Sequence, residues 1–185
     1  TADDVIDTTK GNLVSGILAL AWPSVIQSIL SNCYAMNDYL FIGHMEDKTM
    51  ASIGTSALSS TVGLTIILFS MHNIIPCGCN AYAAQFRGAK DKKGLADTFR
   101  SGFYASIGLS TIISILGYIY IDEIAGMTNS SFEVTRAISI YFGVLLVASP
   151  AFGLLLLVDG FYKSNGDTRT PLYLEILSLI LNTIG

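Results

Sequence analysis

The sequence predicts an all-α membrane protein, a polytopic bundle of five membrane-spanning helices. Of its 185 residues, 51% are hydrophobic and only 13% are charged, and the mean hydropathy is +0.57; a soluble domain carries about 25% charged residues. The basic residues are also clustered, and long apolar stretches without Lys or Arg separate the clusters. A helix needs about 20 mostly apolar residues to cross a bilayer. Five stretches are candidate spans, of which the last covers only 15 residues of the sequence.

Composition also excludes several classes of function. The net charge of −4 leaves no basic field that could bind nucleic acid. The three cysteines, Cys33, Cys77 and Cys79, lie in apolar stretches without the spacing of a zinc or redox site, so we expect small packing residues. The acidic start of the chain does not resemble a secretory signal, so the first apolar stretch is expected to remain as a span.

The first two spans are long and each contains a proline. We expect residues 1–12 to form a cytoplasmic amino tail and residues 13–185 to form the transmembrane domain, whose first span covers about 13–42 with Pro23 inside it. The second span covers about 51–85 and is interrupted by His72 and Pro76. Their length predicts a tilt, a kink or an extension beyond the lipid.

The remaining three spans follow at about 101–121, 137–162 and 171–185. Residues 95–100 are expected to form a separate helical turn on the cytoplasmic surface before the third span. After the fourth span, Gly166 predicts a helix stop, Thr168 or Thr170 an N-cap, and Pro171 the first turn of the next helix. Fifteen residues rise only about 22 Å against a hydrocarbon thickness of about 30 Å, so we expect a longer protein of which this is the front part.

The orientation follows from the ten basic residues. Eight of them fall in the amino tail and in the links after the second and fourth spans, and the opposite links hold only Lys48 and Arg136. Basic residues concentrate on the cytoplasmic side of membrane proteins. The sequence therefore predicts a multi-pass protein of the plasma membrane with a cytoplasmic amino terminus.

Asp38 is the most informative polar residue, because a carboxylate inside a span is expensive unless it serves a function. One interpretation places it high enough in the first span to touch headgroup water. The other places it in a site with Tyr34 and Asn37, where a carboxylate of tunable proton affinity suits a proton or a cation such as Na⁺.

Five further polar residues lie in or near the spans. Glu175 is expected to snorkel or to pair with a basic residue such as Arg169, with a role in gating or ion passage as the alternative. Asp159 and Lys163 are spaced as a helix ion pair, and His72 is expected to be a neutral packing residue. Asn182 lies near the bilayer midplane, where an amide joins helices or lines a cavity.

Four motifs in order resemble the multidrug and toxin extrusion (MATE) family. They are Leu20-Ala-Trp-Pro23; Asn37-Asp38 followed by Phe41-Ile-Gly-His-Met45; Ala84-Gln-Phe-Arg-Gly-Ala-Lys-Asp91; and Gly166-Asp-Thr-Arg-Thr-Pro171. The resemblance covers nearly the whole chain. Tyr39 and Glu175 depart from the usual pattern of the family.

The resemblance implies a twelve-helix protein of two six-helix lobes that exports organic cations and other amphiphiles in exchange for Na⁺ or H⁺. This chain would supply the first five spans of the amino-terminal lobe, with a carboxy-terminal lobe as its missing partner and no cofactor. Asp38 matches the family's coupling residue of the first span, Asn182 the asparagine of the same polar cluster, and Pro23 the proline at which the first helix bends.

Three other functions remain as alternatives. A flippase for lipid-linked oligosaccharide or a similar anionic lipid would need basic residues facing a cavity, and no predicted span contains one. An intramembrane enzyme would need a catalytic constellation that one deep histidine and one deep aspartate do not supply, so we expect no enzyme. In a structural membrane subunit, Asp38 would have no function.

Overall fold

The computed structural model describes residues 13–184, which form seven helices and no strand. The all-α prediction is therefore confirmed. The helices are α1 (Leu13–Gly43), α2 (Lys48–His72), α3 (Ile74–Gly88), α4 (Lys92–Ile119), α5 (Ile121–Gly126), α6 (Phe132–Ser164) and α7 (Arg169–Ile184). Among these described residues, α2, α4 and α6 are both long enough and apolar enough to cross a membrane.

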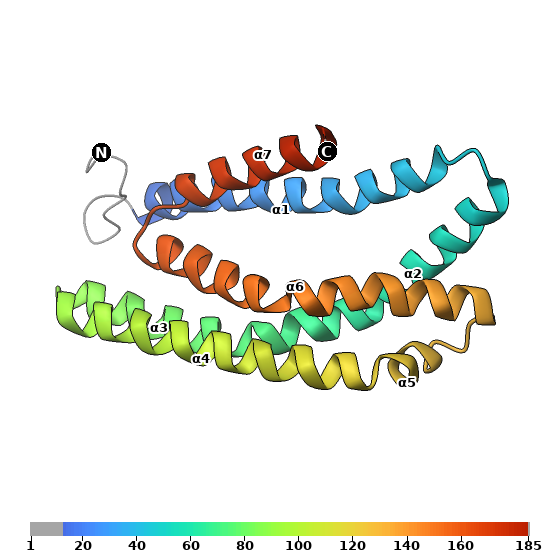
Figure 1. Ribbon diagram of the computed structural model, residues 1–185. Helices are drawn as coiled ribbons and strands as arrows, with labels where there is room; N and C mark the ends of the chain where they lie inside the picture. The colour runs from blue at the N-terminus through green and yellow to red at the C-terminus, as the bar shows by residue number, and fades with distance from the viewer. Residues whose placement is uncertain (1–12, 185) are drawn as a thin grey trace.

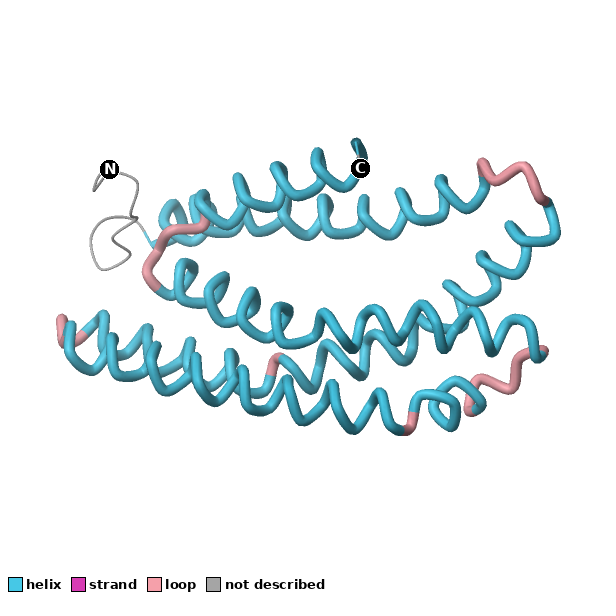
Figure 2. Tube along the Cα trace, in the orientation of Figure 1, coloured by secondary structure: helices cyan, strands magenta, loops and turns pink. Residues whose placement is uncertain are grey.

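The helices form two groups on either side of α6 (Figures 1 and 2). In the first group, α1 and α7 lie side by side. In the second, α2, α3, α4 and α5 pack on α6, which also contacts α7 and carries nine buried residues. The helix α6 is therefore the centre of the fold, and α1 with α7 forms an outer layer.

The second and third predicted spans differ from the structure. The second is two helices, α2 and α3, that meet at Asn73. Pro76 explains the break, because its ring lacks the N–H that would bond to the carbonyl of His72 four residues earlier. The separate surface turn expected at residues 95–100 is wrong, because these residues are part of α4, which begins at Lys92 and runs without interruption to Ile119.

Two tight turns lie at the same end of the bundle (Figure 1) and have the same backbone hydrogen-bond pattern. In the turn after α6, Gly166 has φ of 76° and its N–H bonds to the Lys163 carbonyl, while the Asp167 N–H bonds to the Tyr162 carbonyl. This is a Schellman motif, so the helix stop predicted at Gly166 is confirmed. The turn after α3 repeats it with Lys90 at φ of 58°.

An aspartate follows each of these turns and caps the next helix. Asp91 accepts hydrogen bonds from the backbone N–H groups of Lys93 and Gly94, and Asp167 accepts them from Arg169 and Thr170. The cap predicted at Thr168 or Thr170 is therefore wrong. Burial raises the pKa of the Asp167 carboxyl, but the hydrogen bonds from the Thr170 side chain and from the two N–H groups outweigh it, so the pKa is lowered overall.

Small residues let α4 approach α3 and α6 closely. Gly102, Ser106, Ser110 and Ser114 follow one another at intervals of four along one face of α4. A Cβ atom at Gly102 would lie 2.6 Å from the Cys79 sulfur, and one at Gly153 of α6 would overlap the Ser110 hydroxyl oxygen. Larger residues at these glycines would force the helices apart.

The three cysteines are free thiols. Cys79 packs against Gly102 as expected, and Cys33 is half-buried. Cys77 is exposed on α3, so the expectation that it packs inside the fold is wrong.

Candidate cation-coupling site

Side-chain hydrogen bonds join α1 to α7 along the facing sides of the two helices. The Ser31 hydroxyl donates to the Glu175 carboxylate over 2.8 Å, and the Tyr34 hydroxyl donates to the Glu175 backbone carbonyl over 3.2 Å. Further along, the Asn37 amide donates to the side-chain oxygen of Asn182 over 2.9 Å. Residues 175 and 182 are seven apart, two helical turns, so they face α1 together. We call this set of five residues the α1–α7 seam.

Asp38 lies beside this seam and faces a different helix. Its side chain is half-buried, and its carboxylate is close enough to Tyr141 of α6 for an electrostatic interaction. Successive residues on a helix are turned by about 100°, so Asn37 faces α7 while Asp38 faces α6. Among residues 13–184, no side chain donates a hydrogen bond to this carboxylate. Both of its oxygens are therefore free to accept a proton or a cation.

The predicted cluster is assembled only in part. Tyr34, Asn37 and Asn182 do lie together, but Tyr34 and Asn37 bond to α7 and not to the Asp38 carboxylate. Sequence reasoning missed Ser31 and Tyr141. Tyr141 is a polar group inside the apolar fourth span, which is the signal that could have identified it.

Pro23 is buried inside α1, which is helical on both sides of it. One turn later, Gln27 donates a hydrogen bond from its amide to the Asp159 carboxylate of α6 over 3.0 Å. The predicted pair of Asp159 and Lys163 is confirmed by a distance of 2.7 Å. Asp159 thus binds two donors, one from its own helix and one from α1, and sequence reasoning missed the second.

Glu175 has a definite partner in the structure. Its carboxylate oxygen accepts the Ser31 hydroxyl bond, a contact between helices that neither interpretation of this residue included. The bond joins the first turns of α7 to the middle of α1. Glu175 therefore belongs to the α1–α7 seam, six residues after the start of α7 at Arg169.

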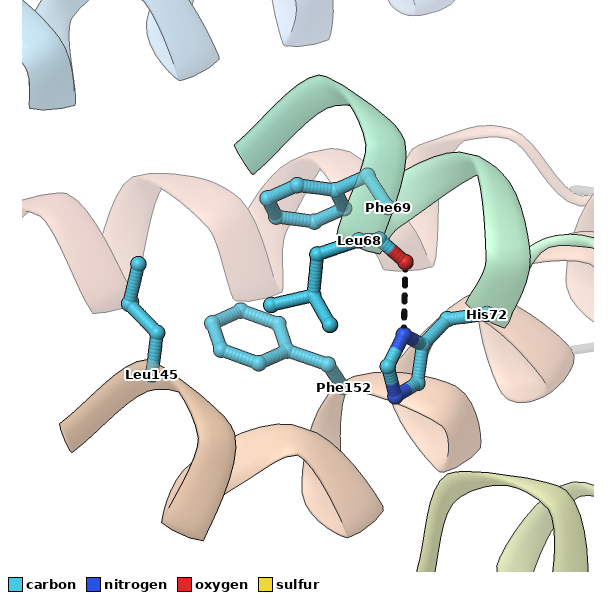
Figure 3. Close-up of a pocket in the computed structure, with 5 residues that line it drawn as sticks. All are labelled: Leu68, Phe69, His72, Leu145 and Phe152. Atoms are coloured by element: carbon cyan, nitrogen blue, oxygen red, sulfur yellow. Dashed lines mark hydrogen bonds between the residues drawn. The ribbon is translucent and has the colours of Figure 1, made fainter. Parts of the chain in front are cut away.

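His72 is buried at the end of α2, with 2% of its surface exposed. Its Nδ1 atom lies 2.7 Å from the Leu68 carbonyl oxygen (Figure 3). Because a carbonyl oxygen can only accept, Nδ1 is the protonated ring nitrogen and donates this hydrogen bond. The ring lines an apolar cavity of about 10 Å³ with Leu68, Phe69, Leu145 and Phe152. Within the described part of the chain its Nε2 atom has no partner, so the expected packing role is confirmed but only one ring nitrogen is satisfied.

Comparison with known proteins agrees with the motifs. The MatE family model matches residues 23–185. A multidrug export protein MepA of Staphylococcus aureus (strain bovine RF122 / ET3-1) is 25% identical over 175 residues, which is 95% of this chain and 38% of that protein. MepA of Staphylococcus saprophyticus subsp. saprophyticus gives the same identity and coverage.

The chain thus spans about two-fifths of the length of these curated relatives. No solved structure matches it significantly. The family model, however, covers most of the chain, including α1 from Pro23, the α1–α7 seam and the two capped turns. The chain therefore belongs to the MatE family of multidrug and toxin extrusion proteins.

Proposed function

We propose that this chain is the amino-terminal part of an ion-coupled antiporter that exports organic cations or other amphiphilic drugs across the plasma membrane. Membership of the MatE family and the similarity to proteins named multidrug export proteins support this function. In the complete protein, a carboxy-terminal lobe would form the other wall of the substrate cavity. The amino terminus would be cytoplasmic, as the distribution of basic residues predicts.

In this proposal, Asp38 is the residue that binds the exchanged Na⁺ or H⁺. The observation behind it is the half-buried carboxylate that faces Tyr141 and, among the described residues, accepts no hydrogen bond. A negative charge in this setting is stabilised by taking up Na⁺ or H⁺. Because the ion binds Asp38 with different affinity in the two conformations, its uptake changes which conformation is favoured.

Pro23 and the α1–α7 seam would transmit this change. The missing N–H of Pro23 weakens α1 at one point, so the segment that carries Asp38 can change its angle there. The seam ties the same segment to α7 through Glu175 and Asn182. Movement of α1 would therefore move α7 as well, and bound drug would be released outward.

The test replaces Asp38 by Asn in the full-length protein. We expect ion-driven efflux of a cationic dye from cells or proteoliposomes to fall at least about tenfold, because the amide has no charge for the ion to neutralise. The Glu123→Gln variant, which removes an exposed acid on α5, is the matched control and should transport normally, because α5 packs on α4 and α6 and not on the seam. Undiminished ion-driven efflux by the Asp38→Asn variant would contradict the proposal.

A lipid flippase and a structural subunit give different results in the same assay. Efflux of a cationic dye by the wild-type protein, lost on substitution of Asp38, separates the antiporter from a subunit that does not transport. Transport of a fluorescent anionic lipid without any dye efflux would favour the flippase.

A further inference from the structure

Three consecutive residues of α1 contact three different helices. Asn37 bonds to α7, and Asp38 faces α6. The Tyr39 hydroxyl lies 3.2 Å from the Ser59 hydroxyl of α2. Successive residues on a helix are turned by about 100°, so each of these three side chains points to a different neighbour. The carboxylate of Asp38 therefore lies between the attachment of α1 to α7 and its attachment to α2.

The hydrogen bond between Tyr39 and Ser59 has a defined direction. The Ser59 hydroxyl donates to the Thr55 carbonyl, one turn earlier in α2, over 2.9 Å. A serine hydroxyl has a single O–H group, which this bond uses, but its oxygen can still accept. Tyr39 is therefore the donor to Ser59, and a change of Tyr39 to Phe removes the donor while it keeps the ring.

This bond lies close to the loop that joins α1 to α2. Three residues nearer to the loop, Ile42 packs on α2, where a Cβ atom at Gly54 would lie 3.2 Å from the Ile42 side chain. Figure 1 shows the two helices diverging from that loop. The seam residues that precede Tyr39 in α1 bond to α7 instead. Tyr39 therefore joins α1 to α2 where the two helices begin to separate.

The bond is also far from the proline at which α1 is proposed to bend. Tyr39 lies 16 residues after Pro23, a rise of about 24 Å, whereas Gln27 lies four residues after it, a rise of about 6 Å. A bend of about 20° at Pro23 would displace Tyr39 by about 8 Å and Gln27 by about 2 Å. A hydrogen bond does not survive a separation of 8 Å. Bending therefore breaks the Tyr39 bond, whereas the flexible Gln27 side chain can keep its bond to Asp159.

We propose that Tyr39 is a positioning residue, whose hydrogen bond to Ser59 holds the segment 24–43 of α1 against α2 in the conformation that binds the ion. We call this conformation closed, and the bent one open. The inference rests on the proposed function, in which the ion binds Asp38. In the closed conformation this carboxylate is half-buried, so an ion stabilises it more than it would in water. Loss of the Tyr39 bond favours the open conformation and thereby opposes ion binding.

The first test measures the two conformations in the purified full-length protein, in buffer with Na⁺ at neutral pH. Spin labels at the exposed positions Met36 of α1 and Val147 of α6 should show a closed and an open population. We expect Tyr39→Phe to lower the ratio of closed to open about threefold to tenfold, as loss of one hydrogen bond does. Ser59→Ala should do the same, and the double variant no more, because each change removes the same bond. Ser59→Thr keeps the hydroxyl and should restore the wild-type ratio.

Transport supplies the second readout. In the Tyr39→Phe variant, the concentration of Na⁺ or H⁺ that gives half-maximal dye efflux should rise about twofold to tenfold. Efflux at saturating ion should stay close to that of the wild type, because Asp38 is unchanged. Tyr118→Phe, at an exposed tyrosine of α4, is the matched control and should change neither value. A Tyr39 with a packing role alone would lower the melting temperature and leave the population ratio unchanged.

The two readouts separate failure of this inference from failure of the proposed function. An unchanged population ratio in both Tyr39→Phe and Ser59→Ala would overturn the inference, even in a protein with normal ion-driven efflux. A half-maximal ion concentration that falls in Tyr39→Phe would overturn the assignment of ion binding to the closed conformation. Absence of ion-driven efflux by the wild-type protein would overturn the proposed function, and the population ratio would still show whether the Tyr39 bond holds α1 against α2.

Discussion

Lys90 occupies a backbone conformation that favours glycine. It has φ of 58° in the turn between α3 and α4, whereas Gly166 holds the same position in the otherwise equivalent turn between α6 and α7. A side chain with a Cβ atom is strained in this left-handed region, and glycine is not. The lysine is therefore retained at a local energetic disadvantage of about 1 kcal/mol.

Replacing Lys90 by Gly should stabilise the protein by up to about 1 kcal/mol, because the strain is relieved while both turn hydrogen bonds are kept. The measurement is the thermal melting temperature of the full-length protein in detergent. Ala89→Gly is the matched control, since Ala89 has φ of −75° and glycine there only adds freedom to the unfolded chain. A melting temperature that falls for both variants would contradict this account.

The helix α6 contains a proline whose missing hydrogen bond is replaced from a neighbouring helix. Pro150 cannot donate to the carbonyl of Leu146, four residues earlier. Ser114 of α4 donates its hydroxyl to that carbonyl over 2.7 Å, and Ser149 donates to the Ser110 carbonyl of α4 over 3.3 Å. These two serine bonds fix the proline of α6 against α4, so we expect no hinge at Pro150.

The Ser114→Ala variant should lose about 1–2 kcal/mol of stability, because a buried carbonyl is left without a donor. In a Pro150→Ala background the residue at position 150 can again donate to Leu146, so the same serine change should be nearly neutral. Melting temperatures of the four proteins form a double-mutant cycle that measures this coupling. Ser70→Ala is the control, since Ser70 is exposed and bonds within its own helix. Equal effects of Ser114→Ala in both backgrounds would refute the assignment.

The molecule as a whole consists of a tightly packed body and an outer pair of helices. In the body, α2 to α6 are held by glycine contacts and by serine hydrogen bonds. Side-chain bonds from α1 to the body include Gln27 to Asp159 and Tyr39 to Ser59, whereas α1 and α7 are joined by the seam. In the proposed transport cycle, we expect α1 and α7 to move together relative to the body.

Spin-label distances in the full-length protein test this inference. Labels at the exposed positions Met36 of α1 and Val147 of α6 should show a distance that changes between the ion-loaded and drug-loaded states. A control pair at Val147 and at Tyr104 of α4, also exposed, should show no change, because both lie in the body. Distances that change equally in the two pairs would mean that the chain moves as one unit.

Particular residues show how far sequence reasoning reached. The helices α1, α6 and α7 were predicted within a few residues because apolar length and turn residues are local signals. The start of α4 is not predictable from the sequence, because the stretch before residue 101 is polar. In the structure Leu95 is half-buried against Ala83 and Phe161, and this contact stabilises the first turns of α4. The sequence predicts a role for Asp38, Asn37 and Asn182 because polar groups are rare inside apolar spans, whereas a serine such as Ser31 is common there and gives no such signal.

The sequence by itself determined that this chain is a bundle of apolar helices with most of its basic residues in the links on one side and a carboxylate in its first span. Those properties depend on composition and on neighbours along the chain. Only the tertiary structure decided that Asp38 faces α6 while Asn37 faces α7, and that Ser114 completes the hydrogen bonding of α6. These depend on how helices are rotated about their axes and packed, which residues distant in the sequence fix together.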